Sequence, residues 1–441
     1  MTQPDVSSAE LLSRRTMLTV LGLFAVGAGP ALVGCSQPSA PGGGGPAGPI
    51  GVSKVKRATV SLSEAPDLPE VVAGMEAFAA RLHALAATPS ANFTVSPLSI
   101  AVAFGMLRAG SRGETATEID AVFGFPPSNR AEGSPHQALN ALTAQLVTPP
   151  RPPSTQPAPA PVVAVANALF VADGFAPSVR RPFLDLLAAQ YGAHPDGVDF
   201  ASPAAVEIIN AWVAKQTHGR IDRLFDELGP GTVMVLANAV YLKATWVTQF
   251  SASATTTGPF TTAAGSSVQA KMMRQATEPV RYTENDRWQR ITLPYVGDEL
   301  TMRIVLPRTV ARDLPALNAL VPVATAPVAA DPYQTVDLTL PRWDTNTSLE
   351  LLSELRELGL NSLGDLTGIA PGVRVTQAVH RANITVDEEG SEAAAVTGIA
   401  IDVSAQVPTT TMRVDRPYAW AVVHEPTQTP VFVGHVVDPS A

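Results

Sequence analysis

The chain has 441 residues, of which 46% are hydrophobic and 16% charged, and its formal net charge is −9. This length supports one large domain or several smaller ones, each with a sizeable core. The acidic balance gives no electrostatic footprint for nucleic acid. The single cysteine, Cys35, excludes an internal disulfide, and seven scattered histidines without an HExxH pattern argue against a metal site. We therefore expect no metal and no cofactor.

The N-terminus resembles a bacterial export signal. A twin arginine precedes an apolar run, residues 17–28, that is too short and glycine-rich for a stable membrane span. The sequence Leu-Val-Gly-Cys at 32–35 resembles the lipobox of bacterial lipoproteins, in which the cysteine is lipidated and the chain is cut before it. We expect residues 1–34 to be a twin-arginine lipoprotein signal peptide and Cys35 to be the lipid attachment site. An ordinary buried cysteine is the alternative.

Export predicts a location on the outer face of the bacterial cytoplasmic membrane, held by the lipid alone, or release outside the cell. Residues 35–57 are rich in Pro, Gly, Ala and Ser and cannot bury enough apolar surface to fold, so they form a tether. Residues 58–441 are expected to form a single domain. The proline-dense segment 149–161 is interpreted as a surface loop in that domain, and a domain boundary is the alternative.

Helices come first in the predicted domain. Apolar residues recur at helical spacing over 68–87. Ser96, followed by proline, has the pattern of a helix N-cap. Ser111 and Glu114 have capping-box spacing, and Gly124 is expected to end the helix that follows them.

Strands dominate the second half. A helix is expected over 206–217, and strands are expected over 162–171, 233–242, 290–294, 300–306, 336–340, 382–386, 420–423 and 431–437. Helices that lead and strands that follow, without strict alternation, predict an α+β fold with large, mostly antiparallel sheets.

Four stretches of this chain carry a common signature: residues 92–100, 238–246, 380–395, and 416–418 with 431–439. In their sequence and order they resemble the serpin family of serine protease inhibitors. The resemblance implies the serpin fold, with helices packed on large β-sheets and an exposed reactive-centre loop at about 388–412.

The resemblance implies an irreversible inhibitor and not an enzyme. A serine protease cuts the loop once, and the loop then enters the main sheet as a new strand with the acylated protease attached. The target protease is the implied covalent partner, and we expect the inhibitor to be a monomer. The 149–161 loop carries only one cation, Arg151, so no heparin-type site is predicted.

The loop sequence meets the physical requirements of an inserting strand. Over 391–403 the odd positions are uncharged and small or β-branched, whereas Glu392 and Asp402 occupy even positions, and no proline occurs over 382–407. An exposed helix starting at the alanines 393–395 is the alternative. The residues assigned to the hinge and to insertion are Glu388, Gly390, Ser391, Ala393, Ala395 and Thr397.

The resemblance also assigns the bond that is cut. If Gly390 is the fifteenth residue before it, the bond joins Ser404 and Ala405, and this register can shift by up to two residues. A small, uncharged specificity residue suits elastase-like or subtilisin-like serine proteases. The resemblance further implies sheet-opening residues: a polar cluster beneath the point where the main sheet opens, formed by Ser96, Ser99, Asn238 and His380, and an aromatic residue, Trp246, near the top of the opening. Asn167 and Asn210 match family positions without an assigned role.

Two other functions have partial support in the sequence. Ser53 and Lys56 match the S-x-x-K pattern of penicillin-recognising enzymes, but neither S-D-N nor K-T-G follows, so a hydrolase is not expected. A non-inhibitory serpin scaffold acting as a carrier or binding protein remains the alternative function. The uncharged odd positions over 391–397 favour inhibition over that alternative.

Overall fold

A computed structural model describes residues 48–127, 134–147, 161–217, 219, 221–229, 231–391, 408 and 410–441. The predicted signal peptide, Cys35, residues 35–47 of the predicted tether and the loop residues 392–407 lie outside the described residues. The prediction of a tether is wrong at residues 48–50, because Gly48 and Pro49 pair with Gly197 and Asp196 and Ile50 buries its side chain in the core. Residues 44–441 form one compact unit. No described helix is long and apolar enough to cross a membrane.

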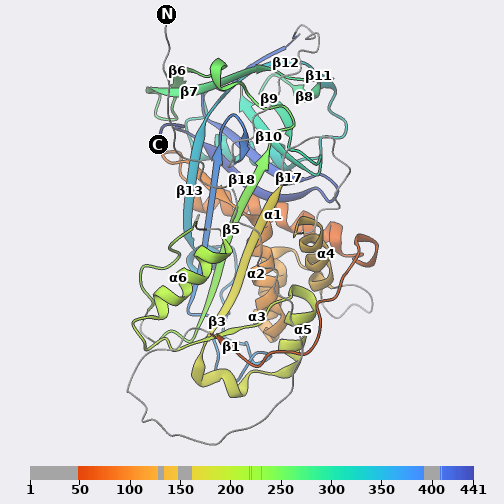
Figure 1. Ribbon diagram of the computed structural model, residues 1–441, viewed down its shortest axis with the longest axis vertical. Coiled ribbons are helices and arrows are strands. Elements are labelled where there is room, and N and C mark those ends of the chain that lie inside the picture. The colour runs from red at the N-terminus through yellow and green to blue at the C-terminus, as the bar shows by residue number, and fades with distance from the viewer. Residues whose placement is uncertain are drawn as a thin grey trace, which may run out of the picture. The chain divides into compact units, whose positions relative to one another are not determined.

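Most of the longer α-helices lie in the first half of the described chain (Figure 1). The α-helices are α1 (Leu68–Ala86), α2 (Pro97–Gly110), α3 (Gly113–Phe123), α4 (Pro135–Val147), α5 (Arg181–Tyr191), α6 (Ala205–Gln216), α7 (Leu314–Asn318), α8 (Val321–Thr325) and α9 (Leu351–Glu357). Short 3-10 helices are η1 (Leu62–Glu64), η2 (Asp173–Ser178) and η3 (Ala252–Ala254).

Two of the three predicted helix-end signals are confirmed. The Ser96 hydroxyl accepts the backbone N–H of Ser99 at 3.1 Å and caps α2. The glycine after α3 adopts a φ of +65°, the left-handed conformation that ends helices. The predicted capping box at Ser111 is wrong: Arg112 is the residue before α3, and it makes no side-chain cap. The Ser111 hydroxyl instead donates to a carbonyl of α2, because a serine directly after a helix can bond back to that helix.

The main sheet has seven strands. In spatial order these are β1 (Gly48–Pro49), β4 (Asp196–Val198), β3 (Val162–Ala172), β5 (Met234–Thr245), β15 (Gly390–Ser391), β14 (Gln377–Val386) and β13 (Trp343–Glu350). The β3–β4 and β5–β14 pairs are parallel and the other pairs are antiparallel.

Two further sheets complete the β-structure. The second sheet is antiparallel and has the order β11 (Tyr333–Gln334), β8 (Val280–Glu284), β9 (Trp288–Pro294), β10 (Leu300–Pro307), β17 (Tyr418–His424), β18 (Thr429–Val436) and β2 (Phe93–Val95). The third has the order β16 (Thr410–Arg413), β12 (Val336–Pro341), β7 (Ser267–Ala276) and β6 (Thr256–Thr261), with β12 and β16 parallel. Every strand expected from the sequence is present, with modest shifts at its ends.

Strand β5 is buried on both faces, and its two faces meet different neighbours. The even-numbered Leu236 and Val240 belong to the large core that also contains the residues of α2. The odd-numbered Val235, Ala237 and Ala239 belong to a separate cluster under α6. Figure 1 shows α2 and α6 on either side of the long strands β3 and β5. A strand added beside β5 would therefore present alternate residues to the core and to α6.

Candidate functional site

The candidate site lies where β5 and β14 separate. These two strands pair directly in parallel from Val235 opposite Gln377 to Val240 opposite Ala382. Beyond this stretch, the two residues of β15 lie between them. Gly390 pairs with Thr245, and Ser391 pairs with both Ala244 and Val386. The start of the predicted inserting segment thus already occupies one end of the opening.

One hydrogen bond between side chains joins β5 to β14 below this opening. His380 Nδ1 bonds to Asn238 Oδ1, and His380 Nε2 accepts the backbone N–H of Ser96 at 3.1 Å. The imidazole therefore carries its proton on Nδ1 and is neutral. Complete burial lowers the pKa of His380 to about 3, since there is no water to solvate the imidazolium.

The Asn238 amide extends this bridge to α2 and β3. Its nitrogen lies 2.7 Å from the Ser99 carbonyl oxygen and 2.8 Å from the Ser99 hydroxyl, and it also contacts Asn167 Oδ1. The structure thus brings together Ser96, Ser99, Asn238 and His380, all of them fully buried. Asn167, which matched a family position without an assigned role, belongs to the same cluster.

Trp246 lies apart from this polar cluster, where the chain approaches the hinge. It follows the last residue of β5, eight positions beyond Asn238, a distance of roughly 25 Å along an extended strand. There its indole N–H donates to the carbonyl of Asp387 at 3.1 Å, and its ring stacks on Tyr295 with 4.4 Å between centroids. Trp246 therefore anchors the chain just before the hinge.

The hinge is tied to the end of β5 through its backbone. The N–H groups of Trp246 and Phe250 donate to the carbonyls of Glu389 and Glu388, each at 2.9 Å. The hydroxyls of Ser391 and Tyr295 are 2.6 Å apart and form a buried hydrogen bond. These bonds fix the direction in which the chain enters the sheet.

Gly390 is required by the close approach of two backbones. Its φ is +155°, and a Cβ at this position would lie 2.0 Å from the carbonyl oxygen of Ala244. No other residue fits without displacing β5. The prediction of a permissive hinge at this residue is consistent with the geometry.

Glu388, a buried carboxylate beside the hinge, forms an ion pair with the exposed Arg342. Its carboxylate is 2.5 Å from the Arg342 guanidinium, and its side chain is 6% exposed. The Thr255 hydroxyl also donates to this carboxylate. Burial alone would raise the pKa of Glu388, but the hydrogen bonds from Arg342 and Thr255 outweigh burial and lower it.

Sequence reasoning missed Tyr295, Arg342 and Asn167 as parts of the site. Tyr295 directly follows a predicted strand, which is a usable signal, whereas nothing near Arg342 indicated a partner 46 positions away. The proposed inserting residues Ala393, Ala395 and Thr397 lie outside the described residues, as do Ser404, Ala405 and Cys35. Among the residues that the structure describes, no three His, Cys, Asp or Glu side chains are grouped to hold a metal ion.

A comparison with protein-family models matches residues 73–439 to the family described as "Serpin (serine protease inhibitor)". Among curated proteins, Iripin-8 of Ixodes ricinus is 31% identical over 373 residues, which cover 80% of this chain and 90% of that protein. Neuroserpin of Homo sapiens is 31% identical over 371 residues, which cover 79% of this chain and 86% of that protein.

Solved structures agree with the fold. Serpin48 of the insect Tenebrio molitor superposes with a TM-score of 0.72 at 27% identity, covering 84% of this chain and 98% of that one. The native state of the thermophilic serpin tengpin gives a TM-score of 0.73 at 21% identity, covering 89% of this chain and all of that one.

Proposed function

This chain belongs to the serpin family, whose members are in general protease inhibitors and not enzymes, and we propose that it inhibits a serine protease irreversibly as a suicide substrate. The protease serine attacks the carbonyl carbon of the residue before the cut, and the peptide nitrogen leaves as a protonated amine. The ester between the two proteins remains. The freed loop then enters the main sheet between β5 and β14 and carries the protease with it before water can cleave the ester.

The observation that carries this proposal is the position of β15. Ser391 already pairs antiparallel with both strands that an inserted strand would separate, and Gly390 pairs with β5. If the same register continues, Thr397 would lie opposite Asn238 on one side and His380 on the other. The inserted strand would then replace the side-chain bond between Asn238 and His380 by backbone pairing along both flanks.

The facing of Ser391 supports this register. Ser391 is fully buried and lies opposite Ala244, one of the even-numbered β5 residues that face the core. In an extended strand the other odd positions face the same way, and these are the uncharged Ala393, Ala395 and Thr397. Glu392 would face the opposite side, so insertion would bury no unpaired charge in the core.

Insertion has enough free energy to act once and irreversibly. About ten new ladder hydrogen bonds at ~1 kcal/mol net each supply on the order of 10 kcal/mol, before side-chain packing is counted. This is comparable to the whole stability of an ordinary domain, of about 5–15 kcal/mol. The uncut chain is therefore held in its state by a kinetic barrier.

We propose Ser404–Ala405 as the bond that is cut, and an elastase-like or subtilisin-like enzyme as the target class. Both assignments rest on the resemblance and on the small, uncharged side chains at this position. We propose in addition that the protein is exported and lipidated at Cys35. The mass of the full chain from a native host tests lipidation, because removal of residues 1–34 and addition of a lipid change it by a defined amount.

The proposal is tested by mixing the purified chain with an elastase-like, a subtilisin-like and a trypsin-like protease. We expect a complex that survives SDS with one of the first two enzymes and a released C-terminal fragment whose mass identifies the bond. Cleavage without a complex would mean that the chain is a substrate or a carrier scaffold. A complex with the trypsin-like enzyme alone would overturn the proposed specificity.

A further inference from the structure

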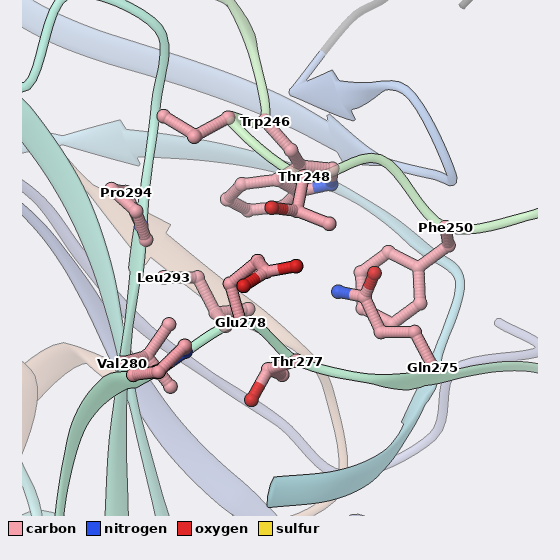
Figure 2. Close-up of a pocket in the computed structure, with 11 residues that line it drawn as sticks. Trp246, Thr248, Phe250, Gln275, Thr277, Glu278, Val280, Leu293 and Pro294 are labelled. Carbon is pink, nitrogen blue, oxygen red and sulfur yellow. The ribbon is translucent and has the colours of Figure 1, made fainter. Parts of the chain in front are cut away.

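A small pocket lies behind the segment that holds the hinge. Its volume is about 110 Å³, and its apolar walls include Trp246, Phe250, Val280, Leu293 and Pro294 (Figure 2). The pocket reaches the surface beside the exposed Thr248 and Glu278. An apolar cavity of about 150 Å³ holds one benzene molecule, so this smaller pocket takes at most a single ring, with any polar group of the ligand at the open mouth.

One buried polar atom of this pocket lacks a partner, and an exposed carboxylate stands at its mouth. Gln275 Oε1 is buried and accepts no hydrogen bond from any described group. The exposed carboxylate of Glu278 forms no ion pair with any described cation. Figure 2 shows this carboxylate pointing into the pocket, and the Gln275 amide beside the Phe250 ring. A buried acceptor without a partner costs free energy, which a ligand with N–H donors would recover.

We propose that this pocket binds a small aromatic cation, a single ring that carries an ammonium or amidinium group. The ring packs against Trp246 and Phe250, where aromatic surfaces gain from stacking and from edge-to-face contact. The cationic N–H groups donate to Glu278 and to Gln275 Oε1. An aromatic anion is excluded because its charge would meet the Glu278 carboxylate.

A ligand in the pocket affects the hinge, because residues that line the pocket also bind the backbone of the hinge. Trp246 and Phe250 are the two residues whose backbone N–H groups hold Glu389 and Glu388. The Trp246 indole also stacks on the ring of Tyr295, and this contact holds the indole in place. A ligand packed against these rings therefore keeps both hydrogen bonds closed and holds the hinge at its present register. This inference concerns the uncut chain and does not depend on the proposed inhibition.

The test uses the full chain and three single-ring probes of similar size, namely benzylamine, benzyl alcohol and phenylacetate. Titration calorimetry is expected to give a dissociation constant of about 1 mM for benzylamine, a value typical of so small a fragment. Glu278→Gln is expected to weaken benzylamine about tenfold, the loss of one charged hydrogen bond, and to leave benzyl alcohol unchanged. Thr248→Phe, a substitution at the exposed rim, is expected to block all binding.

Hydrogen exchange supplies the second measurement, and it requires no protease. With benzylamine bound, we expect the amide hydrogens of Trp246 and Phe250 to exchange several times more slowly, whereas that of Ala168 in β3 exchanges unchanged. The proposal is overturned if benzylamine does not bind at 10 mM, a concentration about ten times the expected constant. It is equally overturned if phenylacetate binds as well as benzylamine, or if Glu278→Gln leaves benzylamine binding unchanged. Binding without slower exchange would overturn the link to the hinge.

Discussion

The side chains of His380 and Asn238 join β14 to β5 directly, through a hydrogen bond from Nδ1 to Oδ1. This bond lies in the stretch where the two strands still pair with each other, below the two residues of β15. A strand that enters between β5 and β14 must break it. The bond therefore contributes to the barrier that keeps the sheet closed.

Loss of the Asn238 amide is expected to loosen the closed sheet. Asn238→Ala leaves His380 Nδ1 and both Ser99 acceptors without this partner in a buried site. We expect the uncut chain to lose about 1–3 kcal/mol of unfolding free energy, measured by denaturant titration. Asn346→Ala, at an exposed position of β13 in the same sheet, is the control and should change stability by less than about 0.5 kcal/mol. Equal losses in the two variants would contradict the role of the cluster.

Stability is expected to fall as the pH decreases from about 6.5, the ordinary histidine pKa, toward 5. Burial lowers the pKa of His83 and His380 to about 3, and that of His136, His424 and His435 to about 4. In this window the unfolded chain binds protons that the folded chain does not. Each of these histidines therefore lowers the free energy of unfolding by up to ~1.4 kcal/mol for each pH unit.

Melting temperatures between pH 7.5 and 5, a range above the ordinary carboxylate pKa of about 4, check this dependence. His380→Gln should reduce the slope of unfolding free energy against pH by the amount that corresponds to about one bound proton. An unchanged slope in this variant would mean that His380 is protonated to the same extent in the folded and unfolded chains.

A side chain at position 390 is expected to expel the hinge from the sheet. In Gly390→Ala the new Cβ would lie 2.0 Å from the Ala244 carbonyl oxygen. We expect slower insertion after cleavage, so that more molecules are consumed as substrate for each protease trapped. Gly174→Ala is the control, because a Cβ there meets nothing within 4 Å. If both variants trap the protease with wild-type stoichiometry, the geometry at Gly390 does not limit insertion.

The register of insertion predicts different effects for two charged substitutions in the loop. Thr397→Arg would bring a cation to the core face beside His380, at a cost of several kcal/mol, and should convert the inhibitor into a substrate. Glu392→Arg changes a charge on the face opposite the core and should leave trapping nearly intact. Gel analysis of complex and cleaved inhibitor measures both. Full trapping by Thr397→Arg would show that the facing is wrong.

Much of the site was predictable because its signals are local. The cap formed by Ser96 follows from the Ser-Pro pair, and the alternation around Ser391 follows from the period of a strand. The pair of Glu388 with Arg342 and the bond of Trp246 with Asp387 depend on segments far apart in the sequence, which no local pattern brings together.

Strand β13 shows a different limit of prediction from the sequence. Its residues alternate between buried and exposed from Trp343 to Ser348, but the buried positions after Trp343 are Thr345 and Thr347. A search for alternating apolar residues does not find such a strand. The hydroxyl of Thr347 accepts the backbone N–H of Thr94, a contact with β2 that becomes visible only in the folded chain. Tertiary contacts, and not local preference, decide this element.

The most direct test of the account is the thermal unfolding of the chain before and after one cut in the reactive loop, made by a protease that the chain does not trap. If the loop inserts between β5 and β14, the cut chain should unfold roughly 20 °C or more above the intact chain, given about 10 kcal/mol released. An unfolding temperature that stays the same or falls after the cut would contradict insertion, and with it the proposed mechanism of inhibition.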